Sequence, residues 1–580
     1  MLNDWNLAGL ALVAVLCFIA GYSRRKVDLR AVSNWKPSRE TKIAALLIAL
    51  GVVLRAWQLF VARGAALPEE LRIILHARSL LADGKSLEGL HWPVVLSGWA
   101  REAEGVLLVW LSMPLVAIFG GTVLAVRLPM FLLSVFCLWV LWDFIRRAFS
   151  SRAAFWALLL AAVAPWQLMA SRWPLTWQLL PYLLLISVWL LSKKRPVWYI
   201  GGMCVLGLTM YTCDAAWCTA PLLALVWAVL AARRRAIRLP AALAGAMVFL
   251  LTALPVLLVL LQGGAAFPHG PMLVTAEPRP VTSLLFLRPT TPEQEGFGPQ
   301  LLPFLKDSAG LASLFMQLSA NGYKLLESTA LQFTPAPLLT AGYLPPDWGL
   351  LYVFFIPLTF FGAVSFAVNS KKVGQGKNLA ADLLIAWPFC GLPFLLLFDE
   401  LTPLHCAALL YPLLLCTAYG AKAAARRFRP AGPALGLLCL AGGLAFSVWG
   451  FDAAPTFPDF QNALTYAREQ PAQQVVVTTY LDATQDPRRA AMTNTLSIFD
   501  LDAAYVRGDR EEPGALPYAE RFRYVRFLSA FVSEEEDIPT YEADPLADAV
   551  YVMHHTEVPV TEMDRFEIVE FGEYVVARGI

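Results

Sequence analysis

Two adjacent acidic residues, Glu69 and Glu70, follow Pro68 just beyond an apolar run of the sequence. A carboxylate at a lipid–water boundary is costly to place and usually carries function. Such a group can act as a general base that takes a proton from a hydroxyl, or it can hold a metal ion. The alternative is the first turn of a solvated helix, because acidic residues after a proline favour a helix start.

Three arginines, Arg55, Arg127 and Arg172, stand near the ends of apolar runs. A guanidinium at such a boundary can bind phosphate through paired hydrogen bonds. It can equally extend toward lipid head groups while its stem stays in the apolar layer. In the membrane topology that the basic clusters indicate, all three arginines fall at the same outer boundary as the acidic pair, which favours a common site.

Two histidines are further candidates for this site. His76 is predicted to lie on the helix that follows the acidic pair, roughly two turns from Glu69. A Glu–His metal site is conceivable there, although no pair has a recognised ligand spacing. His91 could contact a substrate or serve the structure. A divalent metal ion is therefore a possible cofactor, and no other cofactor is indicated.

Several nucleotide and hydrolase motifs are absent from the sequence. It contains no Gly-x-x-x-x-Gly-Lys-Ser/Thr loop, no dinucleotide fingerprint and no serine-nucleophile elbow. ATP-driven transport therefore has no support within the chain.

Composition is typical of polytopic membrane proteins. Of the 580 residues, 58% are hydrophobic, and the mean hydropathy is +0.56. The net charge of +2 hides an asymmetry, since residues 451–580 contain 24 Asp and Glu but only 10 Arg and no Lys. A basic membrane body therefore precedes an acidic tail, and no basic block is long enough to indicate nucleic-acid binding. The nine cysteines all lie in or beside apolar segments, which argues against a disulfide framework.

Apolar runs of about 17–25 residues predict roughly twelve membrane-spanning helices. The runs are 2–22, 43–60, 128–145, 154–169, 175–191, 197–211, 215–230, 239–261, 350–367, 379–398, 405–419 and 433–449. Basic clusters fall in every second connecting loop, which by the positive-inside rule makes those loops cytoplasmic. Both termini, the acidic tail and two long loops, at about 61–124 and 262–349, then lie outside the cytoplasm.

Two apolar runs, 105–119 and 2–22, each allow a second interpretation. The run 105–119 cannot be a span in this topology, because a span there would place the next basic cluster outside. We predict that it forms a helix in the outer leaflet, with an ordinary span as the alternative. The run 2–22 lacks a basic start, so we predict an uncleaved span rather than a signal peptide.

The chain is thus predicted to have a transmembrane domain over 1–450 and a small extracytoplasmic α/β domain over 451–580. In the second domain we expect a helix over 460–468 and strands over 475–480 and 549–553. A hairpin over 566–578 is expected to turn at Gly572.

The order of short motifs between about residues 45 and 235 resembles a known family. Arg55 near the end of an early span precedes the acidic pair, and an Ala-Arg-x-Leu-Leu-x-x-Gly segment follows at 77–84. The remaining matches are Phe119-Gly120, Arg127-Leu128-Pro129, Pro165-Trp166, Ser171-Arg172 and the Gly-Leu-x-x-Tyr-x segment at 207–212. These motifs are similar to those of the dolichyl-phosphate-mannose protein mannosyltransferases and their bacterial relatives, including the aminoarabinose transferases, within the C-type glycosyltransferase superfamily.

The resemblance implies a polytopic α-helical glycosyltransferase. Such an enzyme would move a sugar from a polyprenyl-phosphate donor to an acceptor at the outer face of the membrane, with inversion at the anomeric carbon. Glu69, together with Glu70, would activate the acceptor hydroxyl, while Arg55, Arg127 and Arg172 would hold the donor phosphate. The expected partners are the lipid-linked donor, a protein, lipid or envelope-glycan acceptor, and the bilayer, which we expect to be a bacterial plasma membrane.

Two alternatives stay open, and the first rests on a departure from the family motif. The first acid is usually Asp, and this chain has Glu69. A misplacement of roughly 1 Å can lower the rate on the order of a hundredfold, so a weak pseudoenzyme or scaffold of the same fold is one alternative. The other is a lipid-sugar transporter or flippase, whose spans should carry charges near the midplane and form two related halves. The sequence has few intramembrane charges and no evident repeat.

Overall fold

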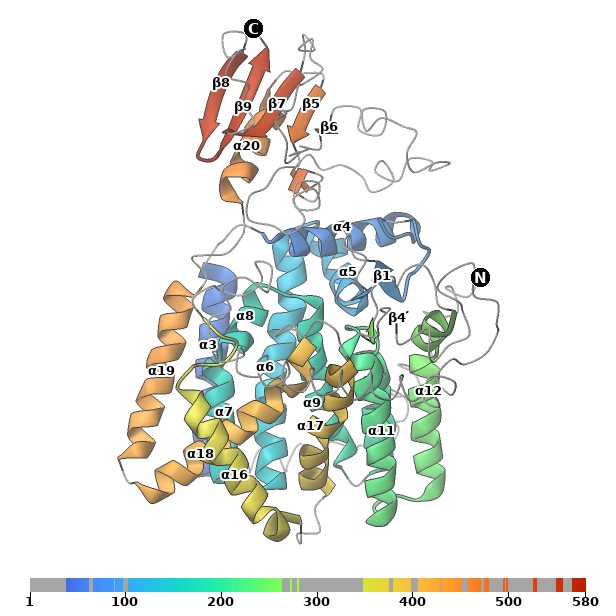
Figure 1. Ribbon diagram of the computed structural model, residues 1–580, viewed down its shortest axis with the longest axis vertical. Coiled ribbons are helices and arrows are strands. Elements are labelled where there is room, and N and C mark those ends of the chain that lie inside the picture. Colours follow the sequence, from blue (N-terminus) through green and yellow to red (C-terminus); the bar gives the residue numbers. More distant parts are fainter. Residues whose placement is uncertain are drawn as a thin grey trace, which may run out of the picture.

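The computed structural model describes a helical bundle with a short helix across one end and a helix-and-sheet unit beyond that helix (Figure 1). The described residues are 38–61, 66–87, 89–97, 103–193, 195–262, 272–273, 279–280, 348–374, 379–397, 405–428, 430–450, 457–470, 474–478, 494–495, 497–498, 525–528, 549–555 and 566–579.

The described helices follow the predicted apolar runs closely. Those of the bundle are α3 (Arg39–Ala56), α5 (Leu107–Phe119), α6 (Val123–Ala148), α7 (Ser151–Val163), α8 (Pro165–Arg172), α9 (Leu179–Leu191), α10 (Pro196–Thr209), α11 (Ala215–Arg233), α12 (Leu239–Gln262), α16 (Phe355–Gly374), α17 (Leu379–Leu397), α18 (Leu410–Arg427) and α19 (Ala431–Trp449). Short turns flank them: the π-helix η1 (Trp57–Val61) and the 3₁₀ segments η2 (Thr176–Gln178) and η3 (His405–Leu409).

Within the described ranges, five helices are long and apolar enough to cross a membrane, and six if the bent pair α7–α8 counts as one span. The five are α6, α11, α12, α18 with Cys406–Leu409 of η3, and α19. The chain is therefore a multi-pass membrane protein. The total of twelve spans stays a prediction, and the run 2–22 lies outside the described residues.

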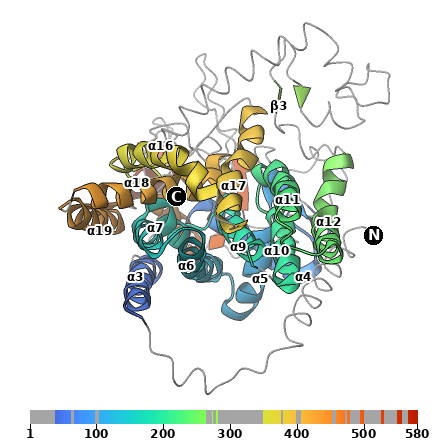
Figure 2. The ribbon, with the colours of Figure 1, turned by 90° about the horizontal axis from the view of Figure 1, so that it is seen from below.

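The centre of the bundle is formed by α9, whose side chains are buried along its whole length. A helix that is apolar on all sides is expected to be enclosed by others. Here α9 packs against α6, α10 and α17, as the view from below shows (Figure 2). At the two sides of the bundle lie α19 and α12.

The run at 105–119 forms α5, a helix of 13 residues. Such a helix is about 20 Å long, shorter than a hydrocarbon layer of about 30 Å. It lies beside α4 (Pro68–Asp83) at one end of the bundle (Figure 1). The location of α5 in the outer leaflet stays a prediction.

A short hairpin, β1 (Val95–Ser97) with β2 (Ala103–Gly105), leads from α4 into α5. It is held on the turn between α10 and α11, because the Leu107 N–H donates to the Tyr211 carbonyl at 3.1 Å. A Cβ on Gly105 would stand 2.0 Å from the Thr212 carbonyl oxygen, so only glycine allows this approach. The first long loop is thereby fastened to the bundle.

The described residues of the acidic tail form a helix and a sheet. They comprise α20 (Pro458–Glu469), β5 (Gln474–Thr478), β6 (Val525–Leu528), β7 (Ala549–His554), β8 (Phe566–Phe571) and β9 (Tyr574–Gly579). In the described residues the strand order is β6-β5-β7-β9-β8, with β5 parallel to β6 and β7, and β9 antiparallel to β7 and β8. The predicted hairpin turns at Gly572, whose φ is +61°.

Two further short strands, β3 (Met272–Leu273) and β4 (Arg279–Pro280), lie outside the tail segment of the sequence and pair with each other.

The tail packs directly on α4. Leu75 of α4 and Leu87 of the following loop are buried in the same apolar cluster as Phe460 and Leu464 of α20. Gln461 of α20 donates from Nε2 to the Ala66 carbonyl at 3.4 Å. The helix that carries the acidic pair is therefore enclosed between the bundle and the tail.

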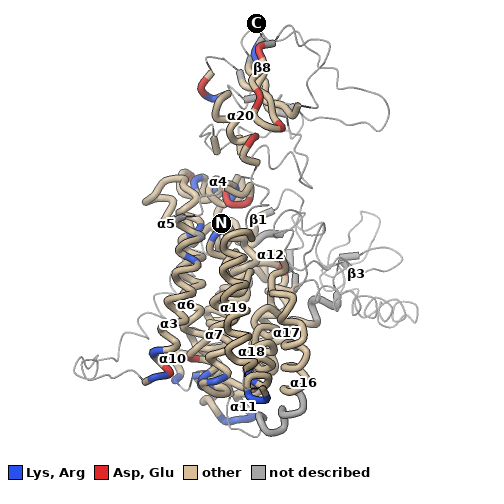
Figure 3. The backbone as a smooth tube through the Cα atoms, turned by 90° about the vertical axis from the view of Figure 1, so that its left-hand side faces the viewer, with Lys and Arg blue, Asp and Glu red and all other residues tan. Residues whose placement is uncertain are grey.

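Lys and Arg gather at the end of the bundle away from α4 (Figure 3). Arg146 and Arg147 stand in the last turn of α6, and Arg426 and Arg427 in the last turn of α18. These two basic clusters thus share one end of the bundle, as the predicted topology requires, and the cluster at residues 24–26 lies outside the described residues. The assignment of that end to the cytoplasm stays a prediction.

Candidate functional site

The acidic pair forms the first turn of α4. Pro68 occupies the first helical position, where its missing N–H is not needed by the helix. The backbone N–H of Leu67 donates to Oε2 of Glu70 at 3.0 Å, which satisfies one of the donors left open at a helix start. The helix dipole also favours negative charge at this end. The local sequence therefore holds both carboxylates at the start of α4.

Glu70 forms a buried, two-pronged ion pair with Arg127 of α6. Nε of Arg127 donates to Oε1 at 2.6 Å, and Nη2 donates to Oε2 at 2.7 Å. Glu70 is fully buried and Arg127 is 5% exposed. Removing one partner of such a pair destabilises a protein by about 3–5 kcal/mol, because the other charge is left buried alone. This pair fixes the start of α4 against α6.

Glu69 has a different environment from its neighbour. Its side chain is 13% exposed, and Oε2 lies 3.9 Å from Nε of Arg72, one helical turn further on. That distance is too long for a hydrogen bond, so the contact is electrostatic. Of the two adjacent carboxylates, one is enclosed and held by short hydrogen bonds, and the other can be reached.

Arg55 stabilises the break between α7 and α8. The two helices meet at 47°, and Pro165 has no N–H to donate to the Ala161 carbonyl four residues earlier. Nη2 of Arg55 donates to Ala161 O at 3.1 Å, and Nη1 donates to Ala162 O at 3.2 Å and to Gly51 O at 3.0 Å. Arg55 therefore replaces backbone donors that the proline break removes.

A polar network continues from Arg55 into the bundle core. Nη2 of Arg55 also donates to Oε1 of Gln167, at 3.2 Å. The same oxygen accepts from the hydroxyl of Tyr182, and Nε2 of Gln167 donates to the hydroxyl of Tyr411, both at 3.0 Å. These bonds join α3, α8, α9 and α18. Arg55 is fully buried, so the geometry favours a bracing role, and the predicted direct contact with phosphate stays untested.

Arg172 is the last residue of α8. Its Cζ lies 5.8 Å from the ring centroid of Trp173, within reach of a cation–π interaction, and the residue is 9% exposed. Of the three predicted arginines, Arg127 is brought to the acidic pair. Arg55 and Arg172 are instead associated with opposite ends of α8.

The predicted histidines occupy separate environments. His76 is buried on α4, and its Nδ1 accepts from the Leu87 N–H at 3.4 Å, which holds the loop after α4. His91 is exposed, and its backbone bridges to Lys85. Among the described residues, no group of three or more His, Cys, Asp or Glu side chains could hold a metal ion. Both Glu70 oxygens accept hydrogen bonds already, and the possible divalent ion stays a prediction.

Sequence reasoning did not identify Arg72 and Gln167. The spacing of Arg72, three residues after Glu69 on a helix, is the signal that could have identified it. Gln167 belongs to the Pro-Trp-Gln segment after the break, but nothing in a single sequence indicates that it meets an arginine more than a hundred residues earlier.

Residues 104–259 match the family described as dolichyl-phosphate-mannose-protein mannosyltransferase. The matched segment contains Arg127, Gln167 and Arg172 and begins after the acidic pair. No curated protein matches the chain by sequence.

Solved structures give a fold comparison. ArnT from Cupriavidus metallidurans in the apo state matches with a TM-score of 0.51 at 13% identity, over 93% of this chain and 98% of that chain. ArnT bound to undecaprenyl phosphate matches with a TM-score of 0.49 at 14% identity, over 92% of this chain and 97% of that chain. The apo oligosaccharyltransferase of Archaeoglobus fulgidus matches with a TM-score of 0.47 at 12% identity, over 80% of this chain and 64% of that chain. This chain therefore spans just under two thirds of the archaeal enzyme's length. The family match and the fold shared with apo ArnT confirm the resemblance to the C-type glycosyltransferase superfamily.

Proposed function

We propose that the protein is a membrane glycosyltransferase that moves a sugar from a polyprenyl-phosphate donor to a hydroxyl-bearing acceptor at the α4 end of the bundle. The match of residues 104–259 to mannosyltransferases and the fold shared with ArnT support this activity. The observation that carries it is the contrast between two adjacent carboxylates: Glu70 is locked by Arg127, and Glu69 is reachable. In our topology this end of the bundle is extracytoplasmic.

Glu69 is the proposed general base. Its carboxylate takes the proton of the acceptor hydroxyl as that oxygen attacks the anomeric carbon. The bond between the anomeric carbon and the phosphate oxygen breaks, and the polyprenyl phosphate leaves with the electron pair. A single displacement of this kind inverts the anomeric centre and needs no enzyme nucleophile.

Glu70 and Arg127 are proposed to position this base. Their ion pair joins α4 to α6 and so sets where Glu69 stands. Arg127 uses Nε and Nη2 for Glu70, which leaves Nη1 as the nitrogen that can contact a donor phosphate. In this proposal Glu70 positions Glu69 and does not itself take the acceptor proton.

Arg172 is the proposed main contact for the donor phosphate. Charge grows on the phosphate as it leaves, and a guanidinium already in place stabilises that charge. Arg55 acts at the other end of the same short helix, where its hydrogen bonds fix the angle of α8. In this proposal Arg55 is a positioning residue and Arg172 is a binding residue.

Turnover by the purified protein tests the proposal. The protein in lipid nanodiscs is offered a panel of polyprenyl-phosphate sugars with candidate acceptors, and released polyprenyl phosphate is measured by mass spectrometry. We expect release with at least one donor, and a product of inverted anomeric configuration by NMR. Parallel reactions with EDTA test the predicted metal dependence.

The same preparation distinguishes the alternatives. No release with any donor, while the donor still binds, would favour the pseudoenzyme. Movement of the intact donor between leaflets of a proteoliposome, without release, would favour the flippase.

A further inference from the structure

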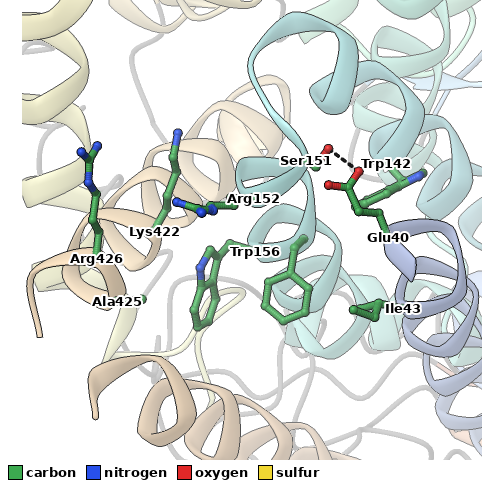
Figure 4. A pocket seen from close by; sticks show the side chains of 10 residues that line it. Glu40, Ile43, Trp142, Ser151, Arg152, Trp156, Lys422, Ala425 and Arg426 are labelled. Atoms are coloured by element: carbon green, nitrogen blue, oxygen red, sulfur yellow. Dashed lines mark hydrogen bonds between the residues drawn. The ribbon is translucent and has the colours of Figure 1, made fainter. Parts of the chain in front are cut away.

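A cavity of about 370 Å³ opens at the end of the bundle opposite the acidic pair, between α3, α6, α7 and α18 (Figure 4). Glu40 lines it from the first turn of α3, whose last turn carries Arg55. An 18-residue helix is about 27 Å long, so the cavity is nearly a membrane thickness from the proposed catalytic end.

The cavity is strongly basic. Arg152, Lys422 and Arg426 line it, and Glu40 is the single carboxylate among its lining residues. Arg152 extends from α7 toward α18, the helix that carries Lys422 and Arg426 (Figure 4). In the described part of the chain, none of the three cations forms an ion pair. Cations that line one cavity repel one another, and a bound anion would relieve that repulsion.

Hydrogen bonds arrange the polar side of the cavity. Oε2 of Glu40 accepts from the Ser151 hydroxyl at 2.7 Å. Nζ of Lys422 donates to the Ser150 hydroxyl at 3.4 Å and lies 4.8 Å from the ring centroid of Tyr419. Lys422 can donate further hydrogen bonds, since an ammonium carries three N–H groups.

The rest of the lining is aromatic and aliphatic. Trp142 and Trp156 are each 7% exposed, and Phe155 and Ile43 continue the apolar wall. Tryptophan is typical of the membrane–water interface. A free inorganic anion has no apolar atoms to pack against these walls, whereas the acyl chains of a lipid can pack against them.

We propose that this cavity binds the phosphate head group of an anionic phospholipid from the leaflet at the basic end of the bundle. Basic pockets between transmembrane helices are suited to anionic lipid head groups. Arg152 and Lys422 contact the phosphate, Arg426 adds attraction, and the tryptophans pack on the glycerol and the first acyl carbons. The lipid joins α18 to α7 and α3, and this site is independent of the proposed sugar transfer.

Lipid titration tests this site. The full-length protein is stripped in a zwitterionic detergent and titrated with phosphatidylglycerol, and bound lipid is counted by native mass spectrometry. We expect Arg152→Gln/Lys422→Gln to weaken phosphatidylglycerol binding by about tenfold or more. Arg233→Gln, an exposed cation in the last turn of α11, is the matched control and should bind as the wild type does. Phosphatidylcholine should bind weakly to every variant.

Three outcomes would overturn the proposal. The first is that the double variant binds phosphatidylglycerol as tightly as the wild type does. The second is that Arg233→Gln loses as much phosphatidylglycerol binding as the double variant loses. The third is that inorganic phosphate at millimolar concentration displaces the lipid, which would indicate a free-anion site. Glu40→Gln keeps the test decisive if the double variant does not fold. It removes the only lining carboxylate, and we expect tighter phosphatidylglycerol binding; unchanged or weaker binding would contradict the proposal.

Discussion

The carboxylate of Glu70 accepts hydrogen bonds from Nε and Nη2 of Arg127 at 2.6 and 2.7 Å, and so ties the start of α4 to α6. Oε2 of the adjacent Glu69 lies 3.9 Å from Nε of Arg72, and 13% of the Glu69 side chain is exposed. Two acids that look equivalent in sequence are thus placed in different environments. We assign positioning to Glu70 and proton transfer to Glu69 on this ground.

Loss of the Glu70–Arg127 pair should destabilise the fold. We expect Glu70→Gln to lower the free energy of unfolding by about 3–5 kcal/mol, since Arg127 would stay buried without its counter-charge. Thermal unfolding in detergent measures the change. Glu70→Gln combined with Arg127→Met should lose less than the sum of the single variants, and strict additivity of the two losses would contradict the pairing.

Arg55 and Pro165 should be energetically coupled. Arg55→Met leaves the Ala161 and Ala162 carbonyls unpaired, and each such group costs about 1–3 kcal/mol. Pro165→Ala restores an N–H that can serve Ala161, so the loss caused by Arg55→Met should be smaller in that background. Unfolding of the four proteins gives the coupling energy.

The control for this cycle is Arg172→Met, at the other end of the same helix. Its effect on unfolding should not depend on residue 165. Coupling of Pro165 to both arginines alike would mean that the proline acts on α8 as a whole, and not through the Ala161 carbonyl.

The sequence predicted where the helices lie better than what their polar side chains do. Apolar runs predicted α6, α11, α12 and α19 well, because burying apolar length is a property of the run itself. The use of Arg55 at the α7–α8 break depends on carbonyls more than a hundred residues away, and no single-sequence pattern encodes that approach. For the same reason the sequence could not tell which of Glu69 and Glu70 would meet Arg127.

The packing of the tail on α4 should be separable from the folding of the tail. Leu75→Ala removes a buried contact between α4 and the α20 cluster, at a cost of about 2–5 kcal/mol. We expect faster hydrogen exchange in the first turn of α20 while the sheet stays protected. Leu464→Ala, inside the tail core, should instead speed hydrogen exchange in β5 and β7 together. Identical exchange patterns in the two variants would contradict a docked, independently folded tail.

This packing also marks a limit of the sequence analysis. Strand and hairpin patterns predicted β5, β7 and the turn at Gly572, because alternation and turn chemistry are local. The burial of Leu75 and Leu87 against Phe460 joins distant parts of the chain. From the sequence, both leucines could equally well have packed within the first long loop.

Arg172 should affect the donor rather than the fold. We expect Arg172→Gln to lower kcat/KM for the polyprenyl-phosphate sugar about a hundredfold, as loss of one group that stabilises a leaving anion does. Lys85→Gln, which removes an exposed cation from the loop after α4, is the matched control and should leave kcat/KM unchanged. A normal rate in Arg172→Gln would place the phosphate elsewhere.

The central claim is that Glu69 takes the acceptor proton. Its most direct test is the single-turnover rate of sugar transfer in Glu69→Gln and Glu69→Asp at saturating donor. We predict a loss of about 10²–10⁴-fold in Glu69→Gln, with donor binding unchanged, and a smaller loss in Glu69→Asp, which keeps a carboxylate but shortens its reach. A Glu69→Gln protein that transfers sugar at the wild-type rate would contradict the assignment.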